Sequence, residues 1–243
     1  MRILILAAGY GTRLYPLTQT TAKSLIPVNK KPIINFLTDK IIRLENNFEI
    51  EQTKVVVNNK FYEDFLEWEK GIEIKADILN DGSNTNEDRL GAIKDINFGI
   101  GGKKGDWLIL GGDNIFDDDL QDFVKFALAK KPFPVIGLYD IGDIKDASKF
   151  GVVKLNPDKQ IVEFQEKPAN PASTLIASCV YYFPEESMSF LDEYLRSQSH
   201  VDQAGHYISW LAHQTKVFGY TLKGNWLDIG HHESLKTAEK MFR

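Results

Sequence analysis

Cysteine is almost absent from this chain of 243 residues, which contains only Cys179. A single cysteine excludes an intrachain disulfide bond and a zinc site built from several thiolates. The residue lies in the apolar-rich run from Leu175 to Phe183. We therefore interpret it as a buried and unreactive thiol.

Long hydrophobic runs and an excess of positive charge are absent as well. The first apolar stretch reaches Gly9 after a few residues, too short for a signal-peptide core or a membrane span. Acidic residues outnumber basic ones by 34 to 29, which disfavours a broad attraction to nucleic acid or to an anionic membrane. We expect a cytoplasmic protein that binds neither, and in which a local cluster holds any anionic ligand.

The remaining pattern predicts an α/β fold. Short β-branched and aliphatic runs alternate with amphipathic stretches, as in βαβ units around a largely parallel sheet. The expected strands are Arg2–Ala7, Lys54–Val57, Ile72–Leu79 and Trp107–Leu110, and the expected helices are Pro32–Leu44 and Leu120–Ala129. After about Lys131 we expect shorter strands at Val135–Tyr139, Gly151–Leu155, Gln160–Phe164 and Thr174–Phe183. No linker interrupts the pattern, so we predict one domain over residues 1–243.

The segment after the first expected strand is rich in small residues and carries two cations. Gly9 and Gly11 let backbone N–H groups approach phosphate oxygens, and Arg13 and Lys23 add positive charge. The spacing matches neither a P-loop nor the dinucleotide fingerprint, because residue 14 is leucine. On glycine spacing alone a structural turn is an equal alternative, whereas the two cations favour a triphosphate site.

Two aspartates end apolar runs far apart in the sequence. Asp113 follows the strand at Trp107–Leu110, and Asp228 lies in a short apolar run before an expected helix near Glu233. Ligands of α/β folds bind at the carboxyl edge of the sheet, and Mg²⁺ is usually held by one or two carboxylates plus substrate phosphates. The alternative is that Asp113 is a turn residue and Asp228 a helix cap.

A third pair of elements offers groups suited to a phosphorylated polyol. Glu166 could bind a hydroxyl and Lys167 a phosphate, about fifteen residues after Gly151. Taken alone, a Glu-Lys pair is more often a solvated surface feature.

Together these elements resemble the sugar-phosphate nucleotidyltransferases. The resemblance is carried by Leu6 to Val28, Leu110–Asn114, Lys149–Val153, Phe164–Pro168 and Trp226–Gly230, in the order found in that family. It implies a Rossmann-like three-layer sandwich with a mixed, mostly parallel sheet. It also implies a nucleotide-binding half over about 1–130 and a sugar-phosphate-binding half over about 131–243. The resemblance ends near Ala238, so we expect no left-handed β-helix extension of the kind some relatives carry.

The resemblance also assigns roles to residues. It implies catalytic roles for Arg13, Lys23, Asp113 and Asp228, with Mg²⁺ held by the two aspartates. The implied nucleotide-binding residues are Leu6, Ala7, Ala8, Gly9, Gly11, Thr12, Arg13, Lys23, Asn80, Gly91 and Asp113, and those for the sugar phosphate are Gly151, Glu166 and Lys167. Asn80 is a candidate only, so the base stays open. Phe150 and His231 depart from the tyrosine and threonine common in relatives.

The implied reaction joins a nucleoside triphosphate, dTTP included, to a sugar 1-phosphate and releases pyrophosphate. The nearest alternative is a cytidylyltransferase acting on a non-sugar phosphate such as phosphocholine. A regulatory module without turnover is a further alternative. An NAD-linked oxidoreductase is another, although the sequence lacks the dinucleotide-binding fingerprint. A homo-oligomer is left open. The five histidines have no convincing ligand spacing for zinc, although two lie close to Asp228 in sequence; they are His200, His206, His213, His231 and His232.

Overall fold

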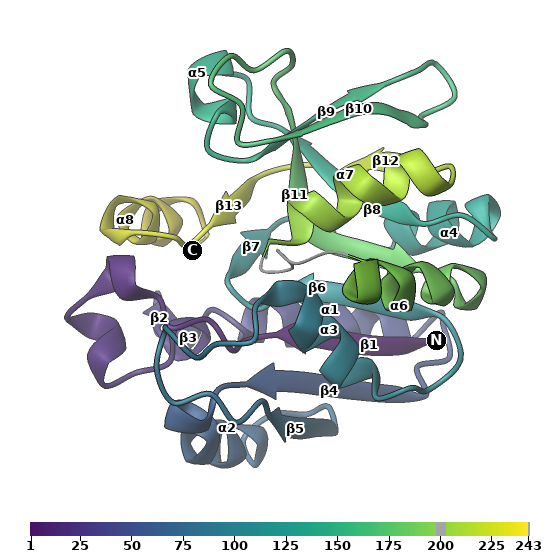
Figure 1. Ribbon diagram of the computed structural model, residues 1–243. Helices are drawn as coiled ribbons and strands as arrows, with labels where there is room; N and C mark the ends of the chain where they lie inside the picture. The colour runs from purple at the N-terminus through teal and green to yellow at the C-terminus, as the bar shows by residue number, and fades with distance from the viewer. Residues whose placement is uncertain (198–202, 243) are drawn as a thin grey trace.

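A computed structural model describes residues 1–197 and 203–242. The strands are β1 (Arg2–Leu6), β2 (Pro27–Val28), β3 (Lys31–Pro32), β4 (Gln52–Val57), β5 (Ala76–Asn80), β6 (Trp107–Gly111), β7 (Asn114–Phe116), β8 (Val135–Asp140), β9 (Gly151–Leu155), β10 (Ile161–Glu166), β11 (Leu175–Phe183), β12 (Phe218–Thr221) and β13 (Trp226–Asp228). The helices are α1 (Asn35–Glu45), α2 (Tyr62–Glu69), α3 (Ala92–Ile100), α4 (Gln121–Lys130), α5 (Ile144–Ala147), α6 (Met188–Ser197), α7 (Ala204–Gln214) and α8 (His232–Met241). Figure 1 shows them arranged around one large sheet.

The large sheet has nine strands and mixed direction. Its main path runs β10-β9-β11-β6-β1-β4-β5, and β8 joins β11 to β12. The first half of the chain contributes the parallel pairs of β1 with β4 and β6, and of β4 with β5. Strand β11 then continues the sheet antiparallel to β6, β8 and β9. The predicted α/β class is confirmed, and the antiparallel strands belong to the second half.

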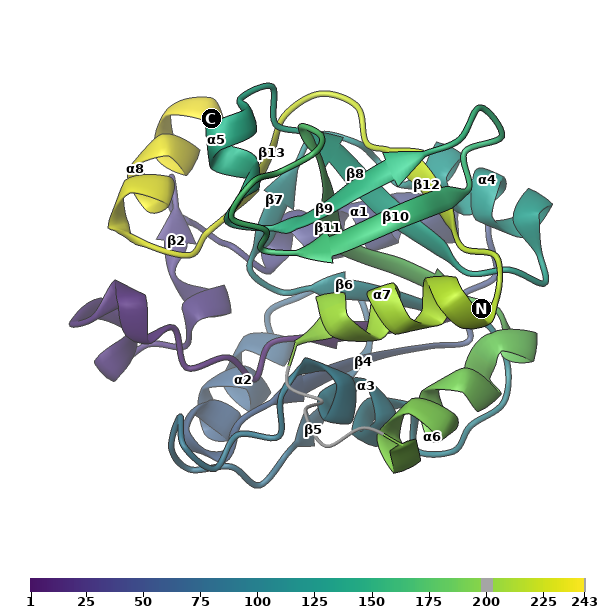
Figure 2. The same cartoon turned by 45° about the horizontal axis from the view of Figure 1, so that its top comes forward.

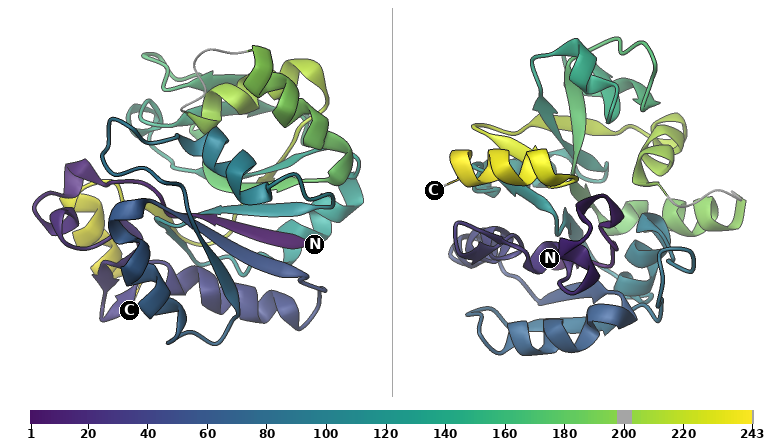
Figure 3. Two further views of the ribbon diagram at one scale, coloured as in Figure 1. Left: turned by 60° about the horizontal axis from the view of Figure 1, so that its bottom comes forward. Right: turned by 90° about the vertical axis from the view of Figure 1, so that its left-hand side faces the viewer.

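Helices cover both faces of this sheet, as the views in Figure 3 show. Alternate side chains of β1 reach opposite faces, because successive residues of a strand point to opposite sides. Ile3 and Ile5 pack in a buried cluster with residues of α1, α2 and α4, whereas Leu4 packs with residues of α3, α6 and α7. Among the described residues, no helix is both long and apolar enough to cross a lipid bilayer.

Two predicted elements begin later than the sequence pattern indicated. The strand expected at Ile72–Leu79 begins at Ala76, because the turn that ends α2 includes Ile72 and pairing with β4 starts opposite Thr53. The helix expected at Pro32–Leu44 begins at Asn35, because Lys31–Pro32 forms strand β3 against β2. The strand predicted at Gly151–Leu155 has these bounds in the structure, and the other predicted elements differ by at most two residues at either end.

A second, small sheet joins two segments that are far apart in the sequence. Strands β7 and β13 pair antiparallel over three residues, with Asp228 opposite Asn114 (Figure 1). Side chains beyond β7 extend this short ladder. Asp117 Oδ2 accepts hydrogen bonds from Asn225 N at 2.9 Å and Nδ2 at 2.7 Å. The buried Asp118 carboxylate accepts from Leu120 N and Lys223 N, both at 3.0 Å.

We expect Asp118→Ala to lower the free energy of unfolding by about 1–3 kcal/mol, because two backbone N–H groups lose their acceptor. Chemical denaturation followed by circular dichroism measures this change. The matched control is Asp122→Ala, which removes an exposed ion pair with Lys223 Nζ of 2.6 Å and should change stability by less than about 1 kcal/mol. Equal effects of the two variants would show that Asp118 does not hold the ladder.

Candidate functional site

The loop after β1 lies at the carboxyl edge of the parallel strands, between β4 and β6. Ala7 N donates to Val56 O and Gly112 N donates to Leu6 O, both at 2.8 Å, so this loop is fixed to both neighbours. Gly11 has a φ of +60°, and Thr18 Oγ1 donates to its carbonyl at 2.7 Å. A Cβ at Gly9 would meet nothing within 4 Å, so a ligand can approach the backbone there.

The two predicted aspartates converge on one buried lysine. Lys23 Nζ lies 2.5 Å from Asp113 Oδ2 and 3.8 Å from Asp228 Oδ1. Lys23 comes from the segment after the first loop, Asp113 directly precedes β7, and Asp228 ends β13. Ile229 N donates to Asp113 O at 3.0 Å, which joins the backbones that carry the two carboxylates.

Opposite charges shift the pKa values of the groups in this cluster. Burial acts to raise the pKa of Asp113, but Lys23 outweighs it and holds the pKa below its usual value. Burial and the neighbouring Asp113 carboxylate raise the pKa of Asp228 to about 6. Burial alone would lower the pKa of Lys23, whereas the two carboxylates hold it above its usual value. Arg13 also lowers the pKa of Asp228 by its charge, so at neutral pH two carboxylates face the Lys23 ammonium and the Arg13 guanidinium.

Asn114 orients the first of these carboxylates. Its Nδ2 donates to Asp113 Oδ1 at 2.8 Å, while its Oδ1 is buried and has no hydrogen-bond partner in the described part of the chain. Next to the second carboxylate, a Cβ at Gly230 would lie 3.2 Å from both Arg13 Nη2 and Asp228 Oδ2. The absence of a side chain at Gly230 thus lets Arg13 approach the Asp228 carboxylate.

A cavity of about 420 Å³ brings six of the predicted residues together: Arg13, Asp113, Gly151, Glu166, Lys167 and Asp228. Gly151 and Glu166 are paired opposite each other in the antiparallel β9–β10 hairpin. Figure 2 shows this hairpin beside α7. Lys167 Nζ lies 3.5 Å from Glu166 Oε1. The Lys167 side chain is 54% exposed, so it can turn toward a ligand. The sugar-side motif and the carboxylate pair therefore line the same space.

The remaining predicted residues do not line this cavity. Lys23 contacts it only through Asp113, and Leu6, Ala7, Ala8, Gly9, Gly11 and Thr12 form the loop next to it. Gly91 caps the start of α3 with a φ of +87°, and its neighbour Ala92 reaches the cavity. Asn80 is engaged elsewhere, since its Nδ2 donates to Asn59 Oδ1 at 2.6 Å and its Oδ1 accepts from Gly82 N at 2.9 Å.

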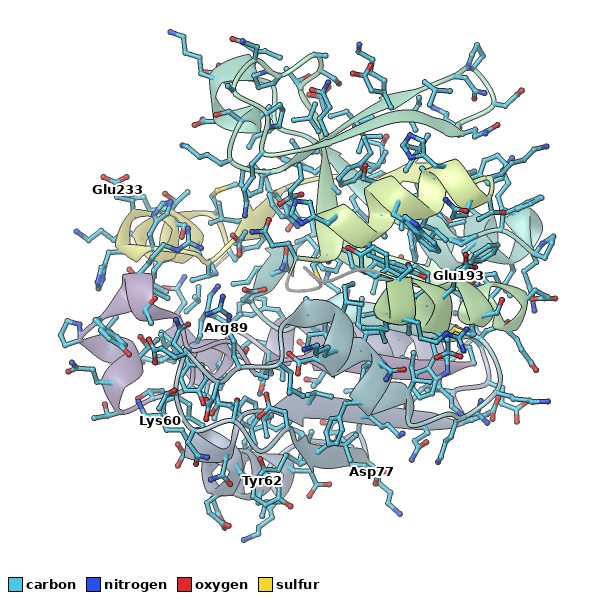
Figure 4. All side chains as sticks on the ribbon, viewed as in Figure 1. Lys60, Tyr62, Asp77, Arg89, Glu193 and Glu233 are labelled. Atoms are coloured by element: carbon cyan, nitrogen blue, oxygen red, sulfur yellow. The ribbon has the colours of Figure 1, made fainter. Side chains whose placement is uncertain are left out.

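Other residues of the polar segment between β5 and α3 lie on the side of the molecule that carries the first loop. In Figure 4 Arg89 is on the side toward which β1 points, whereas Glu193 and Asp77 point outward from α6 and β5. Tyr10 of the first loop donates to Ser83 Oγ at 3.3 Å. This polar segment therefore contacts the first loop.

The cavity-lining residues that sequence reasoning did not assign to the site include Cys179, Tyr181, Gly205 and Trp226. Ala177, Cys179 and Tyr181 alternate along β11, so the period-two pattern of this strand could have indicated that they share a face. Cys179 is half-buried, which corrects the prediction of a buried thiol, because its side chain borders the cavity. Burial still raises the pKa of the thiol to about 12, so it is protonated at neutral pH.

The histidines have separate surroundings. His231 lines the cavity, and its Nδ1 accepts a hydrogen bond from Ser234 N at 3.1 Å as the cap of α8. His232 Nε2 lies 2.9 Å from Tyr15 O. His200 lies outside the described residues. Within 1–197 and 203–242, no three His, Cys, Asp or Glu side chains gather closely enough to hold a metal ion.

A second groove of about 420 Å³ lies at the opposite, amino edge of the parallel strands. Two of its charged groups have partners within the groove: Arg2 Nη2 lies 2.6 Å from Glu51 Oε2, and Lys103 Nζ donates to Gln52 Oε1 at 2.9 Å. Ligands of α/β sheets bind at the carboxyl edge. The cavity near Asp113 is therefore the candidate site.

Curated relatives align along nearly the whole chain. The bifunctional protein GlmU of Methanocaldococcus jannaschii is 31% identical over 244 residues, covering 99% of this chain and 54% of the relative. GlmU of Methanococcus aeolicus is 31% identical over 232 residues, covering 95% of this chain and 51% of the relative. Glucose-1-phosphate adenylyltransferase of Clostridium novyi is 28% identical, and the match covers 98% of this chain and 65% of the relative. The chain thus spans about half the length of the GlmU proteins it matches.

A solved structure shares the fold. It is a protein of Bacillus anthracis provisionally assigned as a glucose-1-phosphate thymidylyltransferase, in complex with sucrose. The TM-score is 0.83 at 23% identity, and the match covers 99% of this chain and 94% of the other. The family model described as nucleotidyl transferase matches residues 2–243. Motif order, fold and this match agree: the chain belongs to the nucleotidyl transferase family.

Proposed function

We propose that this protein transfers a nucleotidyl group from a nucleoside triphosphate to a sugar 1-phosphate and releases pyrophosphate, with Mg²⁺ as cofactor. The observation that carries the proposal is the convergence of Asp113 and Asp228 on Lys23 at the rim of the cavity that contains Glu166 and Lys167. The names of the GlmU and glucose-1-phosphate relatives support a sugar phosphate as the acceptor. On this proposal, one domain has a nucleotide half over about 1–130 and a sugar-phosphate half over about 131–243.

The residues present fit a divalent ion. Carboxylate oxygens are the ligands that Mg²⁺ prefers, and Asp113 and Asp228 bring two carboxylates to the edge of the cavity. Asp113 and Asp228 would hold the ion together with phosphate oxygens of the substrate. When bound, it would neutralise charge on the reacting phosphates.

The side chains supply positioning and charge. A sugar phosphate oxygen forms a bond to the α-phosphorus, and the bond from that phosphorus to the oxygen bridging to the β-phosphorus breaks. The electron pair of the broken bond leaves with pyrophosphate. The attacking oxygen is already ionised at neutral pH, so no general base is needed and alignment provides the catalysis. The glycine loop with Arg13 and Lys23 would bind the triphosphate, while Gly151, Glu166 and Lys167 would bind the sugar phosphate.

We expect Asp113→Asn to lower kcat by roughly 100-fold or more, because a ligand of the ion loses its charge. The free energy of unfolding should change little, since Asn keeps the shape of Asp and Lys23 keeps Asp228 as a partner. Pyrophosphate release and chemical denaturation measure the two effects. Magnesium-dependent turnover near the wild-type rate in this variant would refute the assignment of Asp113.

A substrate matrix tests the proposal as a whole. We expect the wild-type protein to release pyrophosphate from one or more of ATP, CTP, GTP, UTP and dTTP with a sugar 1-phosphate, and to stop when EDTA removes the divalent ion. Turnover only with CTP and phosphocholine would replace the sugar phosphate by a non-sugar acceptor. Absence of turnover with every pair, while nucleotide binding persists, would indicate a regulatory module.

A further inference from the structure

The carboxylate of Glu166 lies in a narrow slot between two glycines from different elements. A Cβ at Gly205, in the first turn of α7, would lie 1.8 Å from Glu166 Oε2 and 2.6 Å from its Cδ. A Cβ at Gly151, opposite Glu166 in the β9–β10 hairpin, would lie 3.1 Å from the same oxygen. The carboxylate therefore packs directly against the backbone at Gly205 and lies close to Gly151 as well.

The elements that form this slot are fixed to each other. Ser209 Oγ of α7 donates to Phe164 O of β10 at 3.4 Å, and Lys167 N donates to Phe150 O at 3.0 Å where the hairpin ends. The side chain of Glu166 is only 13% exposed. Gly205 lies among the first residues of α7, where the amino end of a helix favours a negative charge.

We propose that Gly205 is a positioning residue, which leaves the gap that holds the Glu166 carboxylate toward the cavity for a hydroxyl group of the phosphorylated acceptor. Gly205 also lines the cavity, but its effect on the acceptor would come through the position of Glu166. A side chain at position 205 would push the carboxylate out of the slot. Because the displaced atoms are the far end of a flexible side chain, the fold would accommodate the change at little cost. The proposal rests on the proposed function, since it assigns the acceptor to this cavity.

The consequence for kinetics is specific. A hydrogen bond between a carboxylate and a non-reacting hydroxyl contributes to ground state and transition state alike, so its loss raises KM and leaves kcat nearly unchanged. We expect Gly205→Ala to raise KM for the acceptor by about 10- to 100-fold. The acceptor used is the sugar 1-phosphate that wild-type protein turns over fastest, with glucose 1-phosphate tried first.

Gly71→Ala is the matched control, because the nearest atom to a Cβ there is Trp68 O at an ordinary 3.6 Å. It should leave KM unchanged. Chemical denaturation of both variants should give free energies of unfolding close to that of the wild-type protein. A crystal structure of Gly205→Ala should show the Glu166 carboxylate displaced and the α7 backbone in place.

A double-mutant cycle separates positioning from a general effect on α7. Glu166→Asp shortens the side chain by one methylene, so its carboxylate no longer reaches the slot, and adding Gly205→Ala to it should raise KM less than twofold further. An unchanged KM in Gly205→Ala, or an equal rise in the Glu166→Asp background, would overturn the proposal. Absence of wild-type turnover would instead contradict the proposed function. The crystal structure of Gly205→Ala would then test the positioning role alone, and a Glu166 carboxylate that is not displaced would overturn it.

Discussion

The site depends on one buried ammonium group held between two carboxylates. Lys23 is 9% exposed and lies 2.5 Å from Asp113, with Asp228 at 3.8 Å. Without Lys23 the two carboxylates would repel each other, whereas Lys23 together with Arg13 offsets the charge of Asp228. The arrangement therefore keeps the two carboxylates close together at the cavity.

Backbone geometry brings these groups together from distant parts of the chain. The carboxyl end of β6 delivers Asp113, and the short β7–β13 ladder fixes Asp228 beside it. A slip of that ladder by one residue would turn Asp228 to the opposite face. The hydrogen bonds of Asp117 and Asp118 to residues 223–225 oppose such a slip. This ladder thus adds a second connection between the two halves of the chain, besides the pairing of β11 with β6 in the large sheet.

Local patterns in the sequence predict the parallel strands and the residues that follow them. Apolar runs such as Trp107–Gly111 and the glycines after Leu6 indicate the sheet and its carboxyl edge. Motif resemblance selects Gly151, Glu166 and Lys167, which the structure places in one cavity. Gly205 has no local signal, because its importance arises only when α7 packs against β10. Similarly, Asn80 looked available in sequence, whereas in the fold its amide is engaged by Asn59 and Gly82.

The central claim is that a divalent ion binds between Asp113 and Asp228, next to the cavity that holds Glu166. Anomalous diffraction tests it most directly, on crystals grown with Mn²⁺ and a nucleoside triphosphate analogue that cannot release pyrophosphate. We predict an anomalous peak within coordination distance of a carboxylate oxygen from each of the two aspartates. A Mn²⁺ peak bound to the nucleotide but away from both aspartates would contradict the account.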